Sequence, residues 1–351
     1  MPNLTKNDIQ EVLETIKQLY QEDMIPWICG YSGGKDSTAV VQLVWMALSQ
    51  IPKENRKKTV HVISTDTLVE SPVVALWSST SLAKMRDRAK EAELPIIPHR
   101  LTPATSNTFW VNLIGRGYPY PRRDFRWCTD RMKIDPSNRF IKQILDAESE
   151  AILVLGTRKA ESAIRKATME NYEKKRYRDH LSPNGSFPNS YIFTPIENWS
   201  NDNVWQFLVQ YENCWGHSNK DLLAMYSGAS ADGECPLVLD TSTPSCGNSR
   251  FGCWVCTLVA EDKSMAAMIQ NDEEKAWMLP MLELRNEIAA DWQTDRDRRD
   301  FRRKDGRLTW HNGRLVHGPY AKETRALFLR RLLEVEQLVH EIGPEEIRDV
   351  P

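Results

Sequence analysis

The sequence predicts an α/β fold built on a doubly wound, mostly parallel sheet, followed by a helical C-terminal region that carries cysteines. Short apolar runs alternate with longer segments in which apolar residues recur at helical spacing. That alternation is typical of a parallel sheet with helices on both faces. A glycine-rich turn separates the first apolar run from the helical run after it, which is where such sheets bind anions.

The N-terminal half supplies the strands of this sheet. The expected strands are Ile25 to Cys29, Thr59 to Ser64, Ile96 to Leu101 and Ala151 to Leu155. The expected helices are Lys6 to Glu22, Ala39 to Leu48, Val73 to Glu93 and Asn138 to Asp146. Between them, Thr102 to Asp135 breaks the pattern. Lys166 to Ser190 is polar enough to predict a mobile segment, either a lid or plain disorder.

The C-terminal part is predicted to be helical. Expected helices are Asp202 to Tyr211, Lys220 to Tyr226, two helices within Glu261 to Asp291, and Tyr320 to Ile342. Asp295 to Arg307 holds seven basic and four acidic residues, which suits a solvated helix face or contact with a DNA backbone. We therefore predict two domains, residues 1–200 around the sheet and residues 201–351 as the helical region with its cysteines and basic segment.

Composition limits the function. With 351 residues, 41% of them hydrophobic, the chain can bury a large core. The net charge of -2 excludes a global basic field, so nucleic-acid contacts must come from local patches. No apolar run approaches the roughly 20 residues of a membrane span and no signal peptide is visible, so we expect a cytoplasmic protein. Seven cysteines in a reducing compartment indicate metal or redox chemistry before disulfides.

The glycine-rich stretch Gly30 to Thr38 is a predicted phosphate cradle. Gly33 and Gly34 let the backbone turn tightly and approach a ligand, and Lys35 adds a positive charge. The four-residue gap of a Walker loop is missing. The hydroxyl donors at the start of the next helix are Ser32, Ser37 and Thr38.

Two further strand ends carry candidate ligand residues. Asp66 follows the second strand, where a carboxylate suits a ribose or a metal. Gly156, Thr157 and Arg158 follow the apolar run at Ala151, at the usual ligand crevice of such sheets. We expect these groups to meet the glycine loop at one edge of the sheet.

Several arginines are candidates for contact with nucleic-acid phosphates. They stand beside tyrosines and a tryptophan in an irregular segment, which suits either a solvated loop or a phosphate-binding surface. The candidates are Arg116, Arg122, Arg123, Arg126 and, after the fourth strand, Arg165.

The cysteines Cys246, Cys253 and Cys256 form a C-x6-C-x2-C cluster flanked by glycines. Thiolates with two intervening residues can face one metal centre, and three ligands need a fourth. Cys235 is the candidate nearest in sequence. Four thiolates suit either zinc or an iron-sulfur cluster. Alternatively, the C-x2-C pair could be two incidental buried thiols that bind no metal. Cys29, on the first strand, is expected to be core, and Cys214 receives no role.

The motif Ser32-Gly33-Gly34-Lys35-Asp36-Ser37 resembles the PP-loop of ATP pyrophosphatases, which cleave ATP between its α- and β-phosphates. Over about residues 25 to 210 the chain is similar to the PAPS reductase family. The shared features are this loop, Asp66-Thr67, Arg126 to Thr129, Gly156 to Arg158 with Ser162 and Arg165, Pro195 to Trp199, and Val204-Trp205. The resemblance implies a five-stranded PP-loop sheet that binds an adenine nucleotide. It also implies Cys128 as the fourth ligand of a 4Fe-4S cluster.

The loop Gly30 to Thr38 combined with Cys246 to Cys256 resembles the DndC proteins, the sulfurtransferases of DNA phosphorothioation systems. The likeness spans nearly the whole chain. It implies ATP pyrophosphatase and sulfurtransferase activity on DNA, with ATP, Mg²⁺ and a 4Fe-4S cluster as cofactors. It also implies a cysteine desulfurase and other Dnd proteins as partners, and no membrane.

The resemblance suggests a mechanism in which Lys35 and Arg158 stabilise charge while a DNA phosphate oxygen attacks the α-phosphate of ATP. Asp36 would orient Mg²⁺ or the loop, and Asp66 would contact the nucleotide. Three alternatives stay open: an iron-sulfur tRNA thiolation enzyme, a sulfonucleotide reductase, and a DNA-binding scaffold that senses ATP without turnover. The intact Ser-Gly-Gly-Lys-Asp-Ser motif suits ATP cleavage better than reduction.

Overall fold

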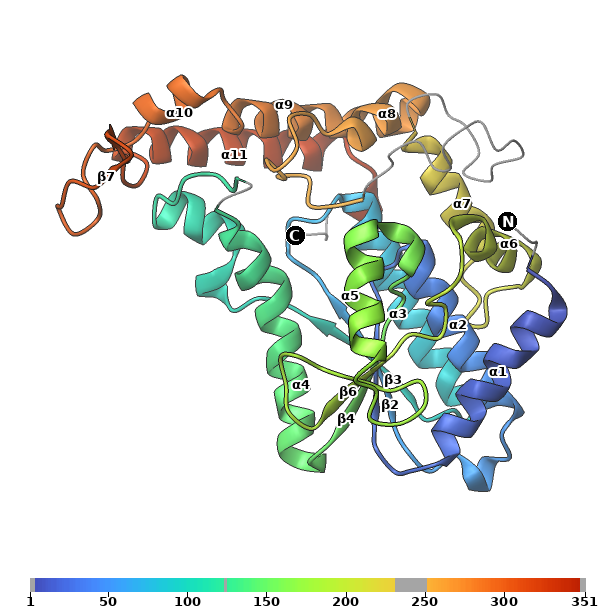
Figure 1. The fold of residues 1–351 in the computed structure, drawn as a ribbon. Helices are drawn as coiled ribbons and strands as arrows, with labels where there is room; N and C mark the ends of the chain where they lie inside the picture. The colour runs from blue at the N-terminus through green and yellow to red at the C-terminus, as the bar shows by residue number, and fades with distance from the viewer. Residues whose placement is uncertain (1–3, 123–124, 231–250, 348–351) are drawn as a thin grey trace.

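The computed structural model describes residues 4–122, 125–230 and 251–347. Within them a six-stranded sheet forms the centre (Figure 1). Its spatial order is β3 (Ile96–Leu101), β2 (Val60–Thr65), β1 (Trp27–Gly30), β4 (Ala151–Val154), β6 (Ser190–Phe193) and β5 (Ser182–Pro183). All neighbouring pairs are parallel except β5 with β6.

The predicted doubly wound, mostly parallel sheet is therefore confirmed, with one strand more than the five expected. The additional strand β5 is a two-residue edge strand paired antiparallel with β6. Two residues are too few to produce a periodic pattern in a sequence.

Helices cover both faces of the sheet. On one face α1 (Lys6–Gln21), α2 (Lys35–Gln50) and α3 (Pro72–Glu91) share a core with α6 (Asn201–Gln210) and α7 (Asn219–Gly228). On the other, α4 (Asp135–Glu148) packs over Ile28, Ile63 and Leu153. Alternate residues of β1 and β4 thus point to opposite faces of the sheet. Both sets are apolar because helices cover both faces.

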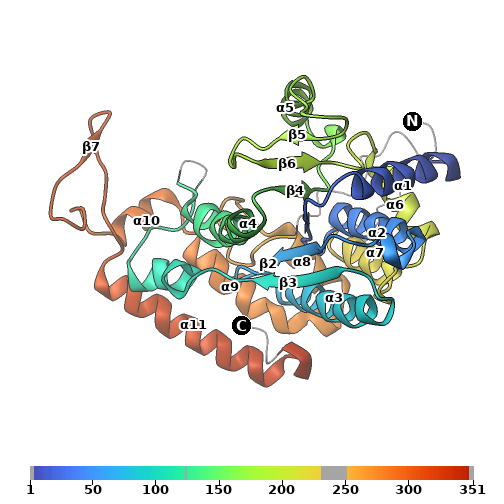
Figure 2. The ribbon, with the colours of Figure 1, turned by 90° about the horizontal axis from the view of Figure 1, so that it is seen from below.

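Part of the segment 166–190, which is predicted to be a mobile lid or disordered, is regular: residues 166–173 are helical, and β5 and the first residue of β6 lie within it. The helix α5 (Ala163–Glu173) begins at Ser162, whose hydroxyl accepts a hydrogen bond from the Arg165 backbone amide. Within the described chain α5 buries none of its side chains, which explains the polar composition of the segment. Figure 2 shows α5 near the β5–β6 edge of the sheet.

The C-terminal helices form a second layer. They are α8 (Lys263–Asn271), α9 (Leu279–Ile288), α10 (Trp292–Asp297) and α11 (Lys322–Ile342), with a small hairpin of β7 (Trp310–His311) and β8 (Arg314–Leu315) before α11. Short 3-10 helices occur at Lys53–Asn55, Thr105–Asn107, Lys159–Glu161, Glu273–Met278 and Glu345–Ile347.

A second hydrophobic core joins these helices to the irregular segment 109–132. Phe109 and Trp127 from that segment pack in one cluster with Met278 and Phe328. The segment has short π-helical turns at Val111–Gly115 and Thr129–Ile134, so it lacks the regular period that identifies helices in a sequence. Figure 1 shows it beneath the α9–α11 layer. None of the helices in the described ranges combines the length and apolar character needed to cross a membrane.

Candidate functional site

A cavity of about 630 Å³ lies at the carboxyl ends of the central strands. The chain leaves β1 toward β2 and β3, and later returns to place β4 on the other side of β1. The loops after β1 and β4 therefore diverge, which opens the crevice typical of doubly wound sheets. Its walls include residues 30–34, residues 64–66 and the turn at Gly156 and Thr157.

The glycine loop after β1 is held in a defined shape. Gly33 has a positive φ of 73°, and a Cβ there would lie 2.4 Å from the Ser78 hydroxyl oxygen. The Trp77 indole N–H donates to the Gly33 carbonyl at 3.0 Å. The Ser37 hydroxyl donates to the Gly34 carbonyl at 3.0 Å and accepts from the Ser32 amide at 3.1 Å. The loop therefore has a defined shape where it leads into the N-terminus of α2, a position at which backbone amides can bind an anion.

The turn after β4 contacts this loop directly. A Cβ on Gly156 would lie 2.9 Å from the carbonyl carbon and oxygen of Asp36, so only glycine fits there. Arg158 is 4% exposed, and its Nε donates to Asp36 Oδ1 at 2.7 Å. Its Nη1 donates to the Trp199 carbonyl at 3.2 Å. The predicted meeting of the two strand ends is present, and Arg158 supports the loop through Asp36.

The Lys35 side chain is held by two residues that line the cavity, Asp36 and Tyr226. Its ammonium lies 3.1 Å from Asp36 Oδ2 and 5.6 Å from the centre of the Tyr226 ring. Within the described chain, the cavity lining includes Asp36 but neither Lys35, Thr38 nor Arg158. Direct contact of those three residues with a nucleotide stays a prediction.

Asp66 lines the cavity at the end of β2 and is oriented by two neighbours. Its carboxylate accepts from the Arg100 Nε at 2.9 Å and from the Leu68 amide at 2.8 Å. Leu68 has a positive φ of 62°, which is unusual for a leucine. Arg100 also lines the cavity, although sequence reasoning placed it only in a strand.

The far side of the cavity carries an ion pair that sequence reasoning missed. Glu70 and Lys133 both line the cavity, and the Lys133 ammonium lies 3.4 Å from Glu70 Oε1. The buried Thr67 hydroxyl donates to the same oxygen at 3.0 Å. Glu70 itself is a candidate from the sequence, because it follows the second strand end, where a carboxylate suits a ribose or a metal, but its partner Lys133 is not. Lys133 lies in a π-helical turn and has no sequence pattern around it.

The cysteine segment lies directly behind this ion pair. The Cys253 sulfur is 3.3 Å from the Thr67 hydroxyl oxygen and 3.7 Å from Glu70 Oε1. Backbone bonds join the two segments, with the Trp254 amide donating to the Val69 carbonyl at 3.0 Å. The fold thus places Cys253 of the C-x2-C motif in contact with Glu70, which lines the cavity, although neither Cys253 nor Cys256 is part of the described lining.

Burial and neighbouring charge set the protonation behaviour here. Burial raises the pKa of the Cys253 thiol to about 12, and the nearby Glu70 carboxylate adds to the rise. Burial also raises the pKa of Cys128. For Lys133, burial lowers the pKa, but Cys253 once its thiol is ionised at high pH, and the Glu70 carboxylate, outweigh that effect and the net shift is upward. Lys133 is therefore a cation at neutral pH.

The metal site predicted from the cysteines is only partly within the described residues. Cys128, Cys253 and Cys256 are described and free of disulfides, whereas Cys246 and Cys235 lie outside the described ranges. Within those ranges, no three His, Cys, Asp or Glu side chains are grouped to hold a metal ion. The predicted ligand set, including the choice between Cys128 and Cys235, therefore stays a prediction. Cys29 is fully buried, as expected.

The candidate phosphate-binding arginines differ in their surroundings. Arg122 forms an ion pair with the buried Asp295, and Arg116 donates to the Asn112 side chain at 3.0 Å. Arg126 is exposed. Arg165 lies 3.3 Å from Glu161 on the surface of α5, and Arg123 lies outside the described residues. Arg122 thus has a structural partner, and the nucleic-acid roles of the set stay predictions.

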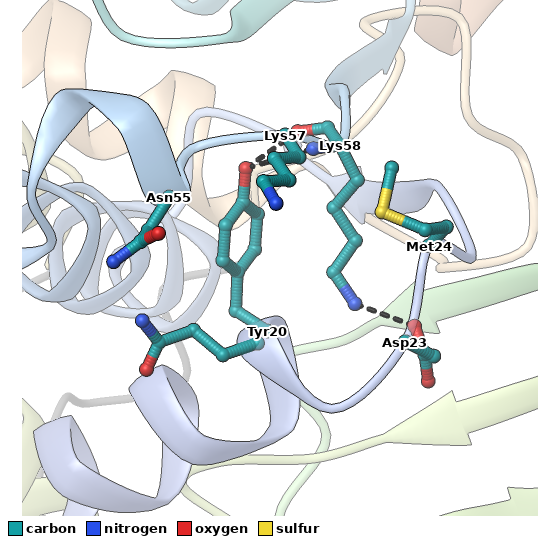
Figure 3. A pocket seen from close by; sticks show the side chains of 7 residues that line it. Tyr20, Asp23, Met24, Asn55, Lys57 and Lys58 are labelled. Carbon is teal, nitrogen blue, oxygen red and sulfur yellow. Dashed lines mark hydrogen bonds and ion pairs between the residues drawn. The ribbon is translucent and has the colours of Figure 1, made fainter.

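A smaller cavity of about 240 Å³ lies at the opposite, amino-terminal end of the strands (Figure 3). The buried Lys58 ammonium there contacts Asp23 at 2.6 Å and lies 5.1 Å from the centre of the Tyr20 ring. The Tyr20 hydroxyl donates to the Lys58 carbonyl at 2.6 Å, and Asp23 also pairs with Arg178. These charges satisfy one another, so the cluster ties α1 to the sheet.

Comparison with known proteins identifies the family. The model of the phosphoadenosine phosphosulfate reductase domain matches residues 26–215, more than half of the 351-residue chain. The chain therefore belongs to this family. The match covers the glycine loop, both strand-end turns and α6.

Three similar proteins illustrate the breadth of the likeness. An uncharacterised protein of Methanocaldococcus jannaschii is 27% identical over 195 residues, which are 56% of this chain and 34% of the relative. This chain thus spans about a third of that relative's length. The phosphoadenylyl-sulfate reductase of Candida auris, in a phosphate complex, is 13% identical over 60% of this chain and 88% of its own, with a TM-score of 0.34. The U34-tRNA thiolase NcsA of Methanococcus maripaludis, with its 4Fe-4S cluster, is 18% identical over 58% and 62%, with a TM-score of 0.36.

Proposed function

We propose that this protein is a PP-loop ATP pyrophosphatase and sulfurtransferase that activates a DNA backbone phosphate by adenylation for sulfur incorporation. One observation carries the proposal. A single cavity has a phosphate cradle on one wall and, on another, the Glu70–Lys133 pair in contact with Cys253. Nucleotide activation and sulfur chemistry would then share one site. The resemblance of both motifs to DndC proteins supports DNA as the acceptor.

ATP would lie with its β- and γ-phosphates on the backbone of the glycine loop. Bound Mg²⁺ would neutralise phosphate charge and help pyrophosphate to leave. Asp36, held by Arg158, keeps the loop and the Gly156 turn together. Lys35 reaches the phosphates by leaving its contact with Asp36, because a lysine side chain is flexible. Asp66 lies at the carboxyl end of β2, where such sheets hold a ribose.

The reaction proceeds in two displacements. A non-bridging oxygen of the DNA phosphodiester attacks the α-phosphorus of ATP, the bond between that phosphorus and the bridging oxygen breaks, and pyrophosphate leaves. The product is a mixed anhydride of the DNA phosphate and AMP. A sulfide sulfur then attacks the DNA phosphorus and AMP leaves with the former phosphate oxygen. A cysteine desulfurase would supply the sulfur as a persulfide, from which two electrons of a thiol reductant release the sulfide, and other Dnd proteins would take part as partners.

Lys133 suits the second displacement. It is a cation on the cavity wall beside Glu70 and Cys253. It would therefore stabilise the negative charge of an incoming sulfur or of the departing AMP. A 4Fe-4S cluster on Cys128, Cys246, Cys253 and Cys256 belongs to the proposal as a separate element, and an iron and sulfide assay after anaerobic purification, compared with Cys253→Ser, tests it.

The decisive experiment follows labelled ATP with DNA and sulfide present. The proposal expects AMP and pyrophosphate rather than ADP and phosphate, together with sulfur in the DNA. Asp36→Asn, which removes the carboxylate that Arg158 binds, should lower pyrophosphate release at least about 100-fold. Asp87→Asn, an exposed carboxylate change on α3, is the matched control and should leave the rate unchanged.

Other outcomes identify the alternatives. Sulfur entering tRNA but not DNA would indicate a tRNA thiolation enzyme. Reduction of an adenylyl sulfate would indicate a reductase. ATP binding with no cleavage, and DNA binding unchanged in Lys35→Ala, would indicate a scaffold.

A further inference from the structure

The segment 300–318, here called the arm, projects from the end of the C-terminal layer. Figures 1 and 2 show it extending beyond α10 and α11. Every residue from 301 to 314 is exposed. A segment with so little burial gains almost nothing from the hydrophobic effect, so its composition reflects something other than packing.

The composition of the arm is basic and aromatic. It contains five arginines and lysines against two aspartates, a formal charge of +3 in a chain whose total is -2. The Trp310 side chain is 64% exposed and Phe301 is 47% exposed. Exposed aromatic rings interleaved with arginines are typical of surfaces on which nucleic-acid bases stack beside their phosphates.

Most of the positive charges on the arm are available to a ligand. Arg307 is paired with Asp305 at 2.8 Å. By contrast, within the described ranges Arg302, Lys304 and Arg314 have no carboxylate within ion-pair distance. The Arg302 guanidinium lies 4.8 Å from the centre of the Phe301 ring, a contact that leaves its charge without a counter-ion. Unpaired exposed cations in a chain of net negative charge complement a polyanion.

The arm has a defined backbone despite its exposure. Asn312 and Gly313 have positive φ values of 48° and 72°, as a tight turn between β7 and β8 requires. At the base, the Asp300 amide donates to the Pro319 carbonyl at 2.9 Å and the Gly318 amide donates to the Asp300 carbonyl at 2.7 Å. A Cβ on Gly318 would lie 1.8 Å from the Arg302 carbonyl oxygen, so this base closes only with glycine.

The base of the arm is tied to the segment that leads to the cavity. The Tyr320 amide donates to the Gly117 carbonyl at 2.7 Å, and its hydroxyl donates to the buried Asp295 at 2.6 Å. Asp295 also pairs with Arg122 of that segment. The same segment continues through the exposed Arg126 to Lys133 on the cavity wall.

We propose that the arm is a DNA-binding element that holds a strand with unpaired bases, its phosphates on Arg302, Lys304 and Arg314 and a base stacked on Trp310. The inference rests on the proposed function for the identity of the nucleic acid. The residues that bind ATP take no part in it, so the two can be tested separately.

The test is fluorescence anisotropy of the full chain with a labelled single-stranded DNA, the same sequence as a duplex, and a tRNA, without ATP. Arg302→Gln with Arg314→Gln should weaken single-strand binding at least tenfold and reduce the slope of log affinity against log salt by about 1.4, for two lost phosphate contacts. Trp310→Ala should weaken it at least about fivefold through lost stacking. The control is Arg88→Gln with Lys90→Gln, at exposed positions of α3. It removes the same amount of positive charge away from the arm and should change single-strand affinity little.

Several results would overturn the inference. One is single-strand binding unchanged in the arm variants; another is an equal loss in the α3 control. Preference for the duplex with no effect of Trp310→Ala would reject stacking, and preference for tRNA would reject DNA. If the arm variants bind normally while wild type still makes pyrophosphate, only the arm fails. If the arm variants lose DNA binding while wild type makes no pyrophosphate, only the proposed function fails.

Discussion

At the scale of single residues, Arg285 is the clearest example of a side chain that positions the cysteine segment. It is fully buried and donates to the Cys256 carbonyl at 3.0 and 2.8 Å, to the Ala260 carbonyl at 2.8 Å and to the Val259 carbonyl. These carbonyls have no regular secondary structure to satisfy them. One guanidinium therefore closes the loop that follows the C-x2-C motif.

Replacing Arg285 with methionine should leave these carbonyls without donors. We expect a loss of about 3 kcal/mol in the free energy of unfolding, because each buried unsatisfied group costs about 1–3 kcal/mol. Alkylation of the Cys256 thiol should also become faster. Arg331→Met removes ion pairs with Glu287 and Glu334 near the surface and should cost much less stability than Arg285→Met. Equal alkylation rates in the two variants would contradict the positioning role.

A histidine pair on the sheet predicts a pH dependence. His61 Nδ1 lies 3.0 Å from His99 Nε2, and Phe140 of α4 packs against both rings. Burial, and then the charge of His99, lowers the pKa of His61 to about 4. Burial and then the charge of Arg86 lower the pKa of His99. Both rings are therefore neutral in the folded protein at neutral pH.

A histidine in the unfolded chain binds a proton with a pKa near 6.5, whereas His61 in the folded protein stays neutral down to a pH of about 4. Protonation therefore favours the unfolded state, so the free energy of unfolding is unaffected above about pH 6.5 and decreases as the pH falls toward 4. Wild type should lose free energy of unfolding between pH 7 and pH 5. In His61→Phe this loss should be smaller by on the order of 1 kcal/mol, after allowance for solvent screening. Denaturant unfolding at both pH values measures it. If His61→Phe loses as much free energy of unfolding between the two pH values as wild type does, the histidine pair is not the source of the pH dependence.

At the scale of elements, the contact between the β4 turn and the start of α2 decides whether the cradle forms. Gly156→Ala places a methyl group 2.9 Å from the backbone of Asp36, and neither backbone can yield easily. We expect a loss of roughly 1–3 kcal/mol in stability and at least a tenfold weaker affinity for ATP, measured by titration calorimetry. Gly228→Ala on α7 is the control, since no atom lies within 4 Å of its added methyl. Unchanged ATP affinity in Gly156→Ala would show that the cradle tolerates separation of the two strand ends.

The elements of the sheet were predictable because each has its own local period. Strands such as Ala151–Val154 and the amphipathic α1 and α11 were predicted to within a few residues. β5 was missed because it has two residues, and α5 because its exposed surface leaves no apolar stripe. The Asn312-Gly313 turn of the arm is a recognisable hairpin signal, but its strands are only two residues each.

At the scale of the whole molecule, the hydrophobic cores link distant parts of the chain. The second core joins residues 109–132 to the C-terminal helices, so the wall that carries Lys133 depends on α9 and α11. Phe328 is fully buried at its centre and packs against Tyr320 with ring centres 5.3 Å apart. The predicted division at residue 200 stays a prediction.

Phe328→Ala should therefore loosen both partners of this core. We expect a loss of about 3–5 kcal/mol, the usual cost of removing a buried phenylalanine. Hydrogen exchange should accelerate in residues 109–132 as well as in α11, while β1 and β4 stay protected. Leu329→Ala, at a 45% exposed position, should cost less than about 1 kcal/mol. Faster exchange confined to α11 would contradict a shared core.

The glycine loop, the turn after β4 and the sheet that presents them follow from the amino-acid pattern, because local spacing and backbone preferences specify each of them. The other side of the site depends on three-dimensional packing. Glu70 and Cys253 are 183 residues apart, and Lys133 lies in a segment with no regular period. Their meeting results from backbone pairing after β2 and from a core shared by distant segments. Such contacts cannot be predicted from local sequence patterns, because residues far apart in the chain share no periodic spacing. Only the folded structure shows that they meet.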